Sequence, residues 1–276
     1  MILIPYIILK GNTLKFLFWN TYRNTNINDI LSDLIVENDV DIAVLAEYES
    51  DLDKLIDALL SKNITISKYI TTGSDKIKML GKVNDVIPQT QSKHYSIQII
   101  KNKYIMCGVH LPSKLYGSGS GQRAIVVRQL LRDLVALEDK KSIDQTIIVG
   151  DMNENPYEEC CLDARWLNSL PSRMDTKRKS RIIQKETFAM FYNPMWNLFG
   201  DFSGPPGSYY FNKNDTDNPM WHILDQVIIR PPLIRSFVND SLRIIDRTSK
   251  ASLLDKRGHP NKKISDHLPI FFEIKE

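Results

Sequence analysis

Apolar runs of strand length recur along this chain, and helical patterns separate only some of them. The opening segment, Leu14–Leu60, alternates a strand pattern with a helix pattern twice, which is typical of layered α/β proteins. Further along, the runs Tyr95–Ile100 and Tyr104–Val109 are joined by a turn of only three residues, so they must pair antiparallel. Mixed pairing with interspersed helices indicates a core of two sheets packed on each other and covered by helices.

The same periodicity assigns the individual elements. Further strands are expected at Leu14–Trp19, Asp41–Ala46, Thr146–Val149, Ile223–Ile229 and Leu268–Ile274. Helices are expected over Ile27–Ile35 with a cap at Asn26 or Asn28, after Ser50 and Asp53, over Ile125–Leu137, and from Pro156 onward. The segments Pro171–Glu186 and Ser203–Ser208 are expected to be surface loops. No repeat or low-complexity linker divides the chain, so we expect one domain over residues 1–276.

Composition sets few limits on function. The chain has 276 residues, of which 42% are apolar, enough for a large core, and its formal net charge of +3 permits an anionic partner without requiring one. Its three cysteines form no C-x-x-C pair, so we interpret them as buried thiols in a reducing compartment. The apolar start Met1–Leu9 is interpreted as a strand or a ragged start, because it has no basic region before it. With no run of membrane-spanning length, we expect a cytoplasmic protein.

Polar residues that can do chemistry stand where the apolar runs end. Any one of them alone is most simply a turn or cap residue. Their repetition at strand ends, where a rigid scaffold often holds functional groups, is the main functional signal. The set is Asn20, Glu47, His110, Asp151, Asn153, Asp225, Asp266 and His267.

The spacing within these groups adds to the signal. Asp151 and Asn153 are two residues apart, so in an extended segment their side chains point the same way. Asp266 and His267 are neighbours that face different directions, which lets one hold a metal while the other meets the substrate. Asp225 could then orient His267 and stabilise its charged form.

Six segments together resemble the endonuclease/exonuclease/phosphatase superfamily, which has the DNase I-like fold. They occur in the family's order and span residues 14 to 272. The G-D-x-N and S-D-H-x-P elements are the most specific of them. The segments are Phe18-Trp19-Asn20, Leu45-Ala46-Glu47, Val109-His110-Leu111, Val149 to Pro156, Leu224 to Val227, and Ser265 to Pro269.

This resemblance implies a four-layer α/β sandwich, with two mixed β-sheets packed face to face and helices on the outside. It also implies a bound Mg²⁺ or Mn²⁺, which prefers the oxygen ligands that acids and amides supply. Glu47 would be the principal metal ligand, assisted by Asn20 and Asp266. The family usually has glutamine before this glutamate, whereas this chain has Ala46, which puts carried-over substrate contacts in doubt.

The resemblance also assigns the remaining catalytic roles. His267, paired with Asp225, would act as general base or orient the attacking water, and Asp151 would help to position that nucleophile. Asn153 and His110 would contact the phosphate oxygens as charge develops. Attack on phosphorus would be in-line, without a covalent enzyme intermediate.

Three further features are candidates for substrate recognition. Arg123, which follows the glycine–serine loop Gly117–Gly121, could meet phosphate or form a surface salt bridge. The basic run Lys177–Arg181 could follow a nucleic-acid backbone or be a solvated face. The aromatic run Tyr209–Phe211 could stack on a base or pack into the core.

Three functions compete on this reading. The first is a nuclease acting on DNA or RNA phosphodiesters. The second is a phosphatase or phosphodiesterase acting on a small or lipid-linked phosphate, such as an inositol phosphate or a sphingolipid head group. The third is a binding module that has kept only the fold, which the full set of acids and histidines argues against. A nuclease needs a long positive groove and a small-substrate enzyme a closed pocket, and the sequence leaves this choice and the oligomeric state open.

Overall fold

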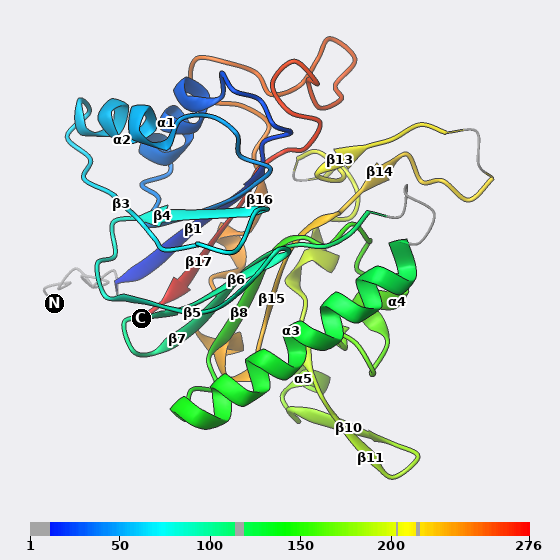
Figure 1. Ribbon diagram of the computed structural model, residues 1–276. Helices are drawn as coiled ribbons and strands as arrows, with labels where there is room; N and C mark the ends of the chain where they lie inside the picture. The colour runs from blue at the N-terminus through cyan, green and yellow to red at the C-terminus, as the bar shows by residue number, and fades with distance from the viewer. Residues whose placement is uncertain (1–11, 114–118, 203, 214–215) are drawn as a thin grey trace, which may run out of the picture.

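The structure is a computed structural model that describes residues 12–113, 119–202, 204–213 and 216–276 (Figure 1). The strand considered at Met1–Leu9 lies outside these residues, as do Gly117 and Ser118 of the glycine–serine loop and the first residue of the loop Ser203–Ser208. Among the described residues, none of the helices combines the length and the apolarity that a bilayer span requires.

The first sheet has six strands in the order β16-β17-β1-β2-β4-β3. Its β1 and β2 are parallel, whereas β1 pairs antiparallel with β17, so segments from the two ends of the chain share this sheet. The strands are β1 (Thr13–Asn20), β2 (Ile42–Ala46), β3 (Ser67–Lys68), β4 (Ile77–Gly81), β16 (Arg243–Ile244) and β17 (Ile270–Lys275).

The second sheet has seven strands in the order β5-β6-β7-β8-β15-β12-β9. The pair β6–β7 is antiparallel, as the short turn predicted, and β7 and β8 are parallel. The strands are β5 (Val86–Ser92), β6 (Tyr95–Ile100), β7 (Tyr104–His110), β8 (Thr146–Asp151), β9 (Ser169–Leu170), β12 (Phe191–Tyr192) and β15 (Asp225–Ile229). Two separate hairpins are β10 (Ser180–Ile183) with β11 (Glu186–Ala189), and β13 (Tyr209–Tyr210) with β14 (Trp221–His222).

The helices cover the outer faces of these sheets (Figure 1). Helices α1 and α2 contact each other beside the first sheet, and α3 lies along the second. The α-helices are α1 (Asn28–Glu37), α2 (Leu52–Leu60), α3 (Gly119–Lys141), α4 (Glu159–Leu162) and α5 (Arg173–Thr176). Three 3₁₀ helices are η1 (Pro194–Leu198), η2 (Pro231–Arg235) and η3 (Asn239–Ser241).

Side chains alternate between the two faces of each strand, so three apolar layers form between the four layers of sheets and helices. In β1, Phe16 and Phe18 point into the core between the sheets, while Leu17 and Trp19 point outward beneath α1 and α2. In β8, Ile148 points the other way from its neighbours, toward buried residues of α3. The expected four-layer α/β sandwich with two mixed sheets is confirmed.

Several local expectations were wrong. Helix α1 has Ile27 at its N-cap and no side-chain cap bond, while α2 is capped by Asp51, whose carboxylate accepts from the two amides of residues 53 and 54. Pro156 does not begin a helix: α4 begins three residues later, at Glu159. The segment expected as the loop Pro171–Glu186 contains α5 and β10. The three cysteines are free and buried, as expected.

Candidate active site

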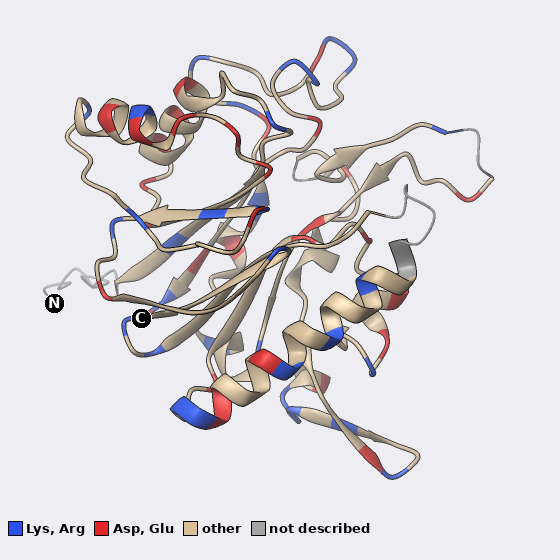
Figure 2. Ribbon diagram, in the orientation of Figure 1, with Lys and Arg blue, Asp and Glu red and all other residues tan. Residues whose placement is uncertain are grey.

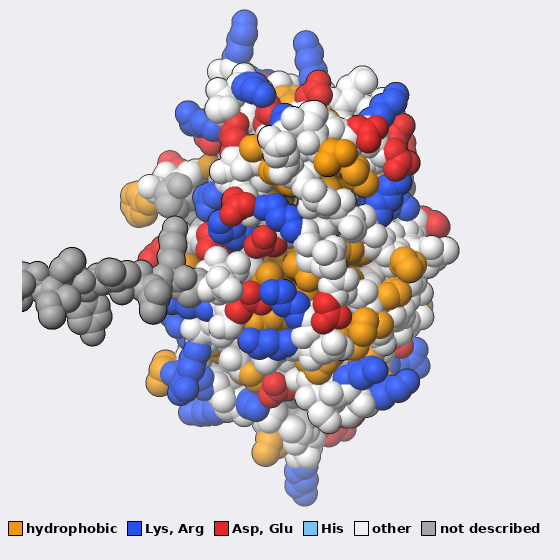
Figure 3. All heavy atoms as spheres, turned by 90° about the vertical axis from the view of Figure 1, so that its left-hand side faces the viewer, with side chains coloured by type: hydrophobic (Ala, Val, Ile, Leu, Met, Phe, Trp, Pro, Cys, Tyr) orange, Lys and Arg blue, Asp and Glu red, His pale blue; other side chains and the backbone are white. Residues whose placement is uncertain are grey.

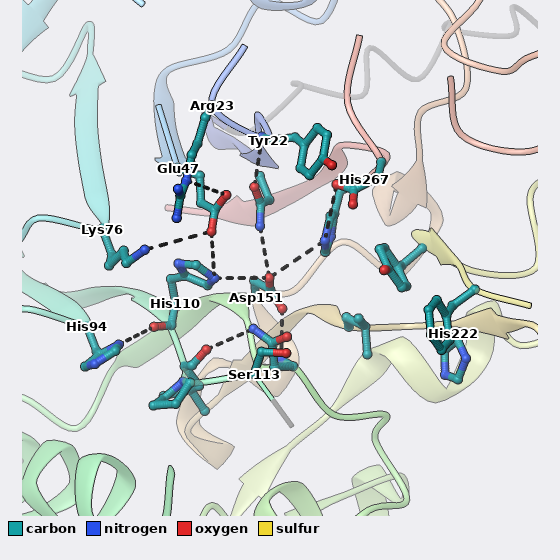
Figure 4. A pocket seen from close by; sticks show the side chains of 18 of the residues that line it. Tyr22, Arg23, Glu47, Lys76, His94, His110, Ser113, Asp151, His222 and His267 are labelled. Carbon is teal, nitrogen blue, oxygen red and sulfur yellow. Dashed lines mark hydrogen bonds and ion pairs between the residues drawn. The ribbon is translucent and has the colours of Figure 1, made fainter. Parts of the chain in front are cut away.

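A cavity of about 670 Å³ opens where the ends of strands from both sheets meet (Figure 4). Seven of the nine candidate site residues line it, although they come from segments spread over most of the chain. These seven are Asn20, Glu47, His110, Asp151, Asn153, Asp266 and His267. Asp225 is fully buried directly behind His267, and Arg123 is the one candidate that lies elsewhere.

Strand register explains why these residues meet. In the second sheet, His110 of β7 is the partner of Asp151 in β8, which in turn is the partner of Asp225 in β15. In the first sheet, Asn20 ends β1 beside the last residue of β2, and Glu47 follows directly. Each sheet therefore delivers one row of polar groups to the same cavity.

Glycine is required at position 150 for this row to form. A Cβ atom added to Gly150 would lie 2.0 Å from the carbonyl oxygen of Val109 on the neighbouring strand. Real Cβ atoms do not approach backbone so closely, so any side chain here would push β7 and β8 apart. The glycine of the G-D-x-N motif thus holds His110 and Asp151 side by side.

The imidazole of His267 is bound to a buried carboxylate. Its Nδ1 lies 2.7 Å from Oδ2 of Asp225, and its backbone carbonyl accepts a hydrogen bond from the indole of Trp19 at 2.9 Å. Burial disfavours the charged ring, but the carboxylates of Asp225 and Asp151 outweigh that effect and raise the pKa of His267 to about 10. The ring therefore carries a proton at neutral pH.

Asp151 occupies the centre of the site. Its two oxygens accept hydrogen bonds from the backbone amide of Asn153 at 2.8 Å and from the side-chain amide of Asn20 at 3.0 Å. Burial, together with the charge of Asp225, raises the pKa of Asp151 to about 7, against the opposing effect of His267. This carboxyl can therefore exchange a proton near neutral pH.

Ligand atoms of Asp151, Asp225 and His267 lie within 4.8 Å of one another, so this group could hold a metal ion. The short contact between Asp225 and Nδ1 of His267 already engages two of the three groups with each other. Because Nδ1 of His267 is already engaged by Asp225, the ring could meet a cation only through Nε2, while the same short contact lets the cluster share protons.

The carboxylate of Glu47 is surrounded by nitrogen atoms that do not hydrogen-bond to it. Arg23 Nε lies at 3.4 Å, His110 Nε2 at 3.7 Å and Lys76 Nζ at 3.9 Å (Figure 4). Burial and the nearby positive charges lower the pKa of His110 to about 3, so its contacts with Glu47 and Asp151 are those of a neutral ring. Glu47 itself has φ of +48°, a left-handed conformation that turns the chain at the end of β2.

The donor set fits a divalent metal at the expected ligands. Oδ1 of Asp266 is buried and accepts no hydrogen bond from any residue that the structure describes, and burial raises the pKa of this carboxyl. A buried oxygen without a hydrogen bond, in the same cavity as a second carboxylate, that of Glu47, suits the hard cations Mg²⁺ and Mn²⁺. Asn20 is less available, because its Oδ1 already accepts from the amide of Tyr22 at 3.1 Å.

Asn153 reaches the cavity from a left-handed backbone position, with φ of +51°. Its side-chain amide donates to the carbonyl of Leu111 at 2.9 Å, which fixes its orientation next to the end of β7. The side chain therefore presents its remaining amide hydrogen and oxygen from a fixed position.

The structure corrects the assignment of Arg123 to substrate binding. The side chain is 1% exposed, forms an ion pair with Glu154, and donates to the carbonyl of Pro112 at 3.0 and 2.9 Å. A guanidinium that is buried and paired in this way is not presented to a phosphate in the cavity. Arg123 instead fixes the chain just after the end of β7, beside Ser113 on the cavity wall.

The residues on one side of the cavity were not predicted from the sequence, and the residues on the other side were given too little weight as site residues. Lys76, Lys93 and His94 line it, although none was singled out. The predicted hairpin could have identified His94 as a site residue, because residues at the start of β6 must lie opposite those at the end of β7. The amide of His110 indeed donates to the carbonyl of His94 at 2.8 Å. Tyr209, for which stacking on a base and packing into the core were both left open, also lines the cavity, and its ring centroid lies 4.7 Å from that of His267.

The basic run Lys177–Arg181 does not take part in this site. None of its residues lines the cavity, and it leads into the β10–β11 hairpin, which Figure 1 shows at the far end of the molecule from β13 and β14. Lys179 pairs with Asp144, and Arg181 donates to the carbonyl of Leu162.

No protein-family model and no curated protein sequence matches the chain. Solved structures do match, over nearly its full length. An AP endonuclease from Archaeoglobus fulgidus is 14% identical with a TM-score of 0.59, covering 95% of this chain and 100% of its own. The 3′ phosphatase NExo from Neisseria, bound to a product DNA hairpin, is 14% identical with a TM-score of 0.57 and the same coverage. The human Nocturnin catalytic domain, with a bound sulfate anion, is 14% identical with a TM-score of 0.53, covering 95% of this chain and 93% of its own.

These likenesses are likenesses of fold. They confirm that the chain folds as DNase I-like proteins do, which the sequence motifs predicted. The chemistry of the cavity has to be argued from its own residues.

Proposed function

We propose that this protein is a metal-dependent phosphoesterase that hydrolyses phosphodiester bonds, with DNA or RNA as the favoured substrate. One observation carries the proposal: His267 and Asp151, with Asp225 buried behind the imidazole, form a group that can share protons, and they line the same cavity as two carboxylates suited to a divalent cation, Glu47 and Asp266. A phosphoesterase needs both parts, because it must activate water and neutralise the charge on the phosphoryl group.

Glu47 and Asp266 would hold the Mg²⁺ or Mn²⁺, with Asn20 beside them. When bound, the ion would polarise a phosphoryl oxygen and help the leaving group to depart. The orphaned Oδ1 of Asp266 and the absence of hydrogen bonds to the Glu47 carboxylate from the described residues support this ligand set.

The pKa values favour a particular catalytic role for each of the other residues. His267 already carries a proton at neutral pH, so it would bind the phosphate as a cation that Asp225 keeps charged and oriented. Asp151, with a pKa of about 7, would accept the proton of the attacking water. The oxygen of that water would bond to phosphorus as the opposite P–O bond breaks, while His110 and Asn153 contact the phosphoryl oxygens. This assignment of roles differs from the expectation that His267 acts as general base or orients the attacking water.

Two observations support a nucleic-acid substrate. The cavity is lined by cationic side chains on one side and by aromatic rings on the other, which suits phosphates and bases. Two of the matching structures are those of an AP endonuclease and of a 3′ phosphatase bound to a product DNA hairpin.

A phosphatase or phosphodiesterase acting on a small or lipid-linked phosphate is the second candidate. Lys, Arg, Asp and Glu are interspersed over the fold, and the face in Figure 3 mixes both signs instead of forming one continuous basic surface (Figures 2 and 3). A cavity of about 670 Å³ is also within the range of small-molecule sites. Both observations suit a substrate that is held within the cavity alone.

A substrate panel in Mg²⁺ or Mn²⁺ tests the proposal. It would contain plasmid, single-stranded DNA and RNA, duplex with an abasic site, inositol phosphates and a generic phosphodiester. We expect cleavage of nucleic acid that EDTA abolishes and that His267→Ala removes, whereas His259→Ala, at a histidine outside the cavity, retains it. Activity confined to the small esters would reject the nuclease in favour of the second candidate, and no metal-dependent activity on any substrate would reject the proposal.

A further inference from the structure

The cavity has two chemically different sides. In Figure 4, Lys76 and His94 lie on one side of His110 and Asp151, and His222 lies on the other. Tyr209 belongs with His222, since their ring centroids are 6.4 Å apart. We call the side formed by Lys76, Lys93 and His94 the basic side.

The basic side is assembled from both sheets. Lys76 directly precedes β4 of the first sheet, whereas Lys93 and His94 form the turn between β5 and β6 of the second. His94 is held in place because its Nδ1 lies 2.9 Å from the carbonyl oxygen of His110. Burial lowers the pKa of His94, and the charges of Lys93 and Lys76 lower it further; all three side chains line the same cavity.

The positive charges on this side are poorly compensated. Lys93 forms no ion pair with an acid among the described residues, and the one described carboxylate near Lys76 is that of Glu47, at 3.9 Å. Glu47 is also the proposed metal ligand. Once its charge is neutralised by a divalent cation, neither lysine has a carboxylate to balance it, so an anion from the substrate would be attracted there.

We propose that Lys76 and Lys93 bind a second phosphate group of the substrate, next to the phosphate that is hydrolysed. Lys76 Nζ and His110 Nε2 both contact Oε1 of Glu47, at 3.9 and 3.7 Å, so the two nitrogens lie within two contact lengths of each other. One phosphate at His110 and its neighbour at Lys76 can therefore belong to one molecule. This inference rests on the proposed function and deepens it: the preferred substrate carries at least two phosphates.

The neighbouring phosphate of a nucleic-acid strand is the source that the site favours. The aromatic rings of Tyr209 and Phe211 stack at 6.3 Å across the cavity from the lysines, where a base attached to the reacting phosphate could lie. A small bisphosphate such as an inositol bisphosphate has the same second anion but no aromatic base to place there.

The rates at which dinucleotides with one or two phosphates are hydrolysed measure the contribution of the second phosphate directly. TpT has one phosphate, while pTpT and TpTp each add one more, at either end. We expect kcat/KM for at least one of the two to exceed that for TpT by about tenfold, the equivalent of one charge-assisted contact. In Lys76→Ala and in Lys93→Ala that ratio should fall toward one, whereas Lys68→Ala, at a lysine that pairs with Asp53 outside the cavity, should leave it unchanged.

A binding measurement separates this inference from the proposed function. Calorimetry of pTpT with the His267→Ala protein and with its Lys93→Ala double variant reports affinity without turnover, and we expect about tenfold weaker binding in the double variant. If both lysine variants show metal-dependent hydrolysis and keep the wild-type ratio of kcat/KM values between the dinucleotides, the inference is overturned and the proposed function stands. No hydrolysis at all, with pTpT binding that depends on Lys93, would overturn the proposed function alone. A preference for inositol bisphosphate over monophosphate, without any among the dinucleotides, would overturn the nucleic-acid source.

Discussion

Asp151 and Asp225 are directly opposite each other on the antiparallel strands β8 and β15, and His267 bridges them. Its Nδ1 lies 2.7 Å from Asp225 and its Nε2 lies 3.9 Å from Asp151. Residues that face each other across an antiparallel pair project from the same side of the sheet, so the two carboxylates share one buried space. A protonated imidazole between them is what makes two buried acids tolerable.

The metal-free protein should therefore lose stability as pH rises above neutral. The pKa of His267 is about 10 in the folded protein and 6.5 ordinarily, so the folded state holds an extra proton between these values. This contribution is fully present below pH 6.5 and is lost as pH rises toward 10, with a slope of up to about 1.4 kcal/mol per pH unit. Chemical denaturation in EDTA between pH 7 and 8.5 measures it, above the range in which Asp151, with its pKa of about 7, contributes most.

Asp225→Asn tests the cause of that slope. Removing the adjacent charge should lower the pKa of His267, flatten the stability profile above pH 7 and reduce turnover, because the imidazolium loses its partner. NMR titration of the His267 ring follows the pKa directly. A profile as steep as that of the wild type would exclude Asp225 as the source of the proton affinity.

Glu47→Gln should weaken Mg²⁺ or Mn²⁺ binding by more than about tenfold, because it removes the charge of the proposed principal ligand. Glu49→Gln is the matched control, since that side chain is 57% exposed and does not line the cavity. Isothermal titration calorimetry compares the two affinities, and circular dichroism checks that the fold is retained. Equal affinity in the two variants would place the metal elsewhere, with the cluster of Asp151, Asp225 and His267 as the next site to test.

Arg123→Met should destabilise the fold by about 3–5 kcal/mol, because it leaves the carboxylate of Glu154 buried without its partner. Adding Glu154→Gln should recover part of this loss, since an amide oxygen can still accept the hydrogen bond that Cys160 donates at 2.7 Å. Urea denaturation of the two single variants and the double variant forms a complete cycle. Additive losses would show that the two side chains do not stabilise each other.

Gly150→Ala should cost about 1–3 kcal/mol of stability and lower activity, because the new methyl group collides with the backbone of β7 and displaces His110 from Asp151. Gly121→Ala, in α3, has open space around its Cβ position and should be neutral or stabilising by up to about 1 kcal/mol. Thermal unfolding of the pair separates steric collision from a general effect of losing glycine. Equal melting temperatures would contradict the close approach of β7 and β8.

The sequence was most informative where period-2 and period-3.6 patterns were unbroken. Leu14–Trp19 and Asp41–Ala46 were identified as strands to within two residues, because each is a continuous apolar run buried on both faces. The strand β5 was missed, because it lies at the edge of its sheet, contains Pro88 and is largely polar. Short strands such as β9 and β12 have too few residues to show any period.

The site residues, too, were predictable from the sequence only in part. The strand-end residues Asn20, Glu47, His110 and Asp151 could be found because each interrupts an apolar pattern with a functional group. Arg123 was misassigned, because the local sequence does not reveal that Glu154, which comes 31 positions later, would bury it in an ion pair. The lysines of the basic side were missed for a related reason: turn residues are normally polar, so nothing in their composition distinguishes these from others.

The pairing of β1 with β17 joins segments from opposite ends of the chain, with Thr13 beside Lys275. Contacts between residues so far apart in sequence carry the largest loop-closure entropy and form slowly. The strands β5, β6 and β7 follow one another closely and have no such barrier. Glu47 and His267 both depend on the slower sheet, so we expect the cavity to assemble only with the last long-range contacts, and recovery of the proposed activity to time the end of refolding.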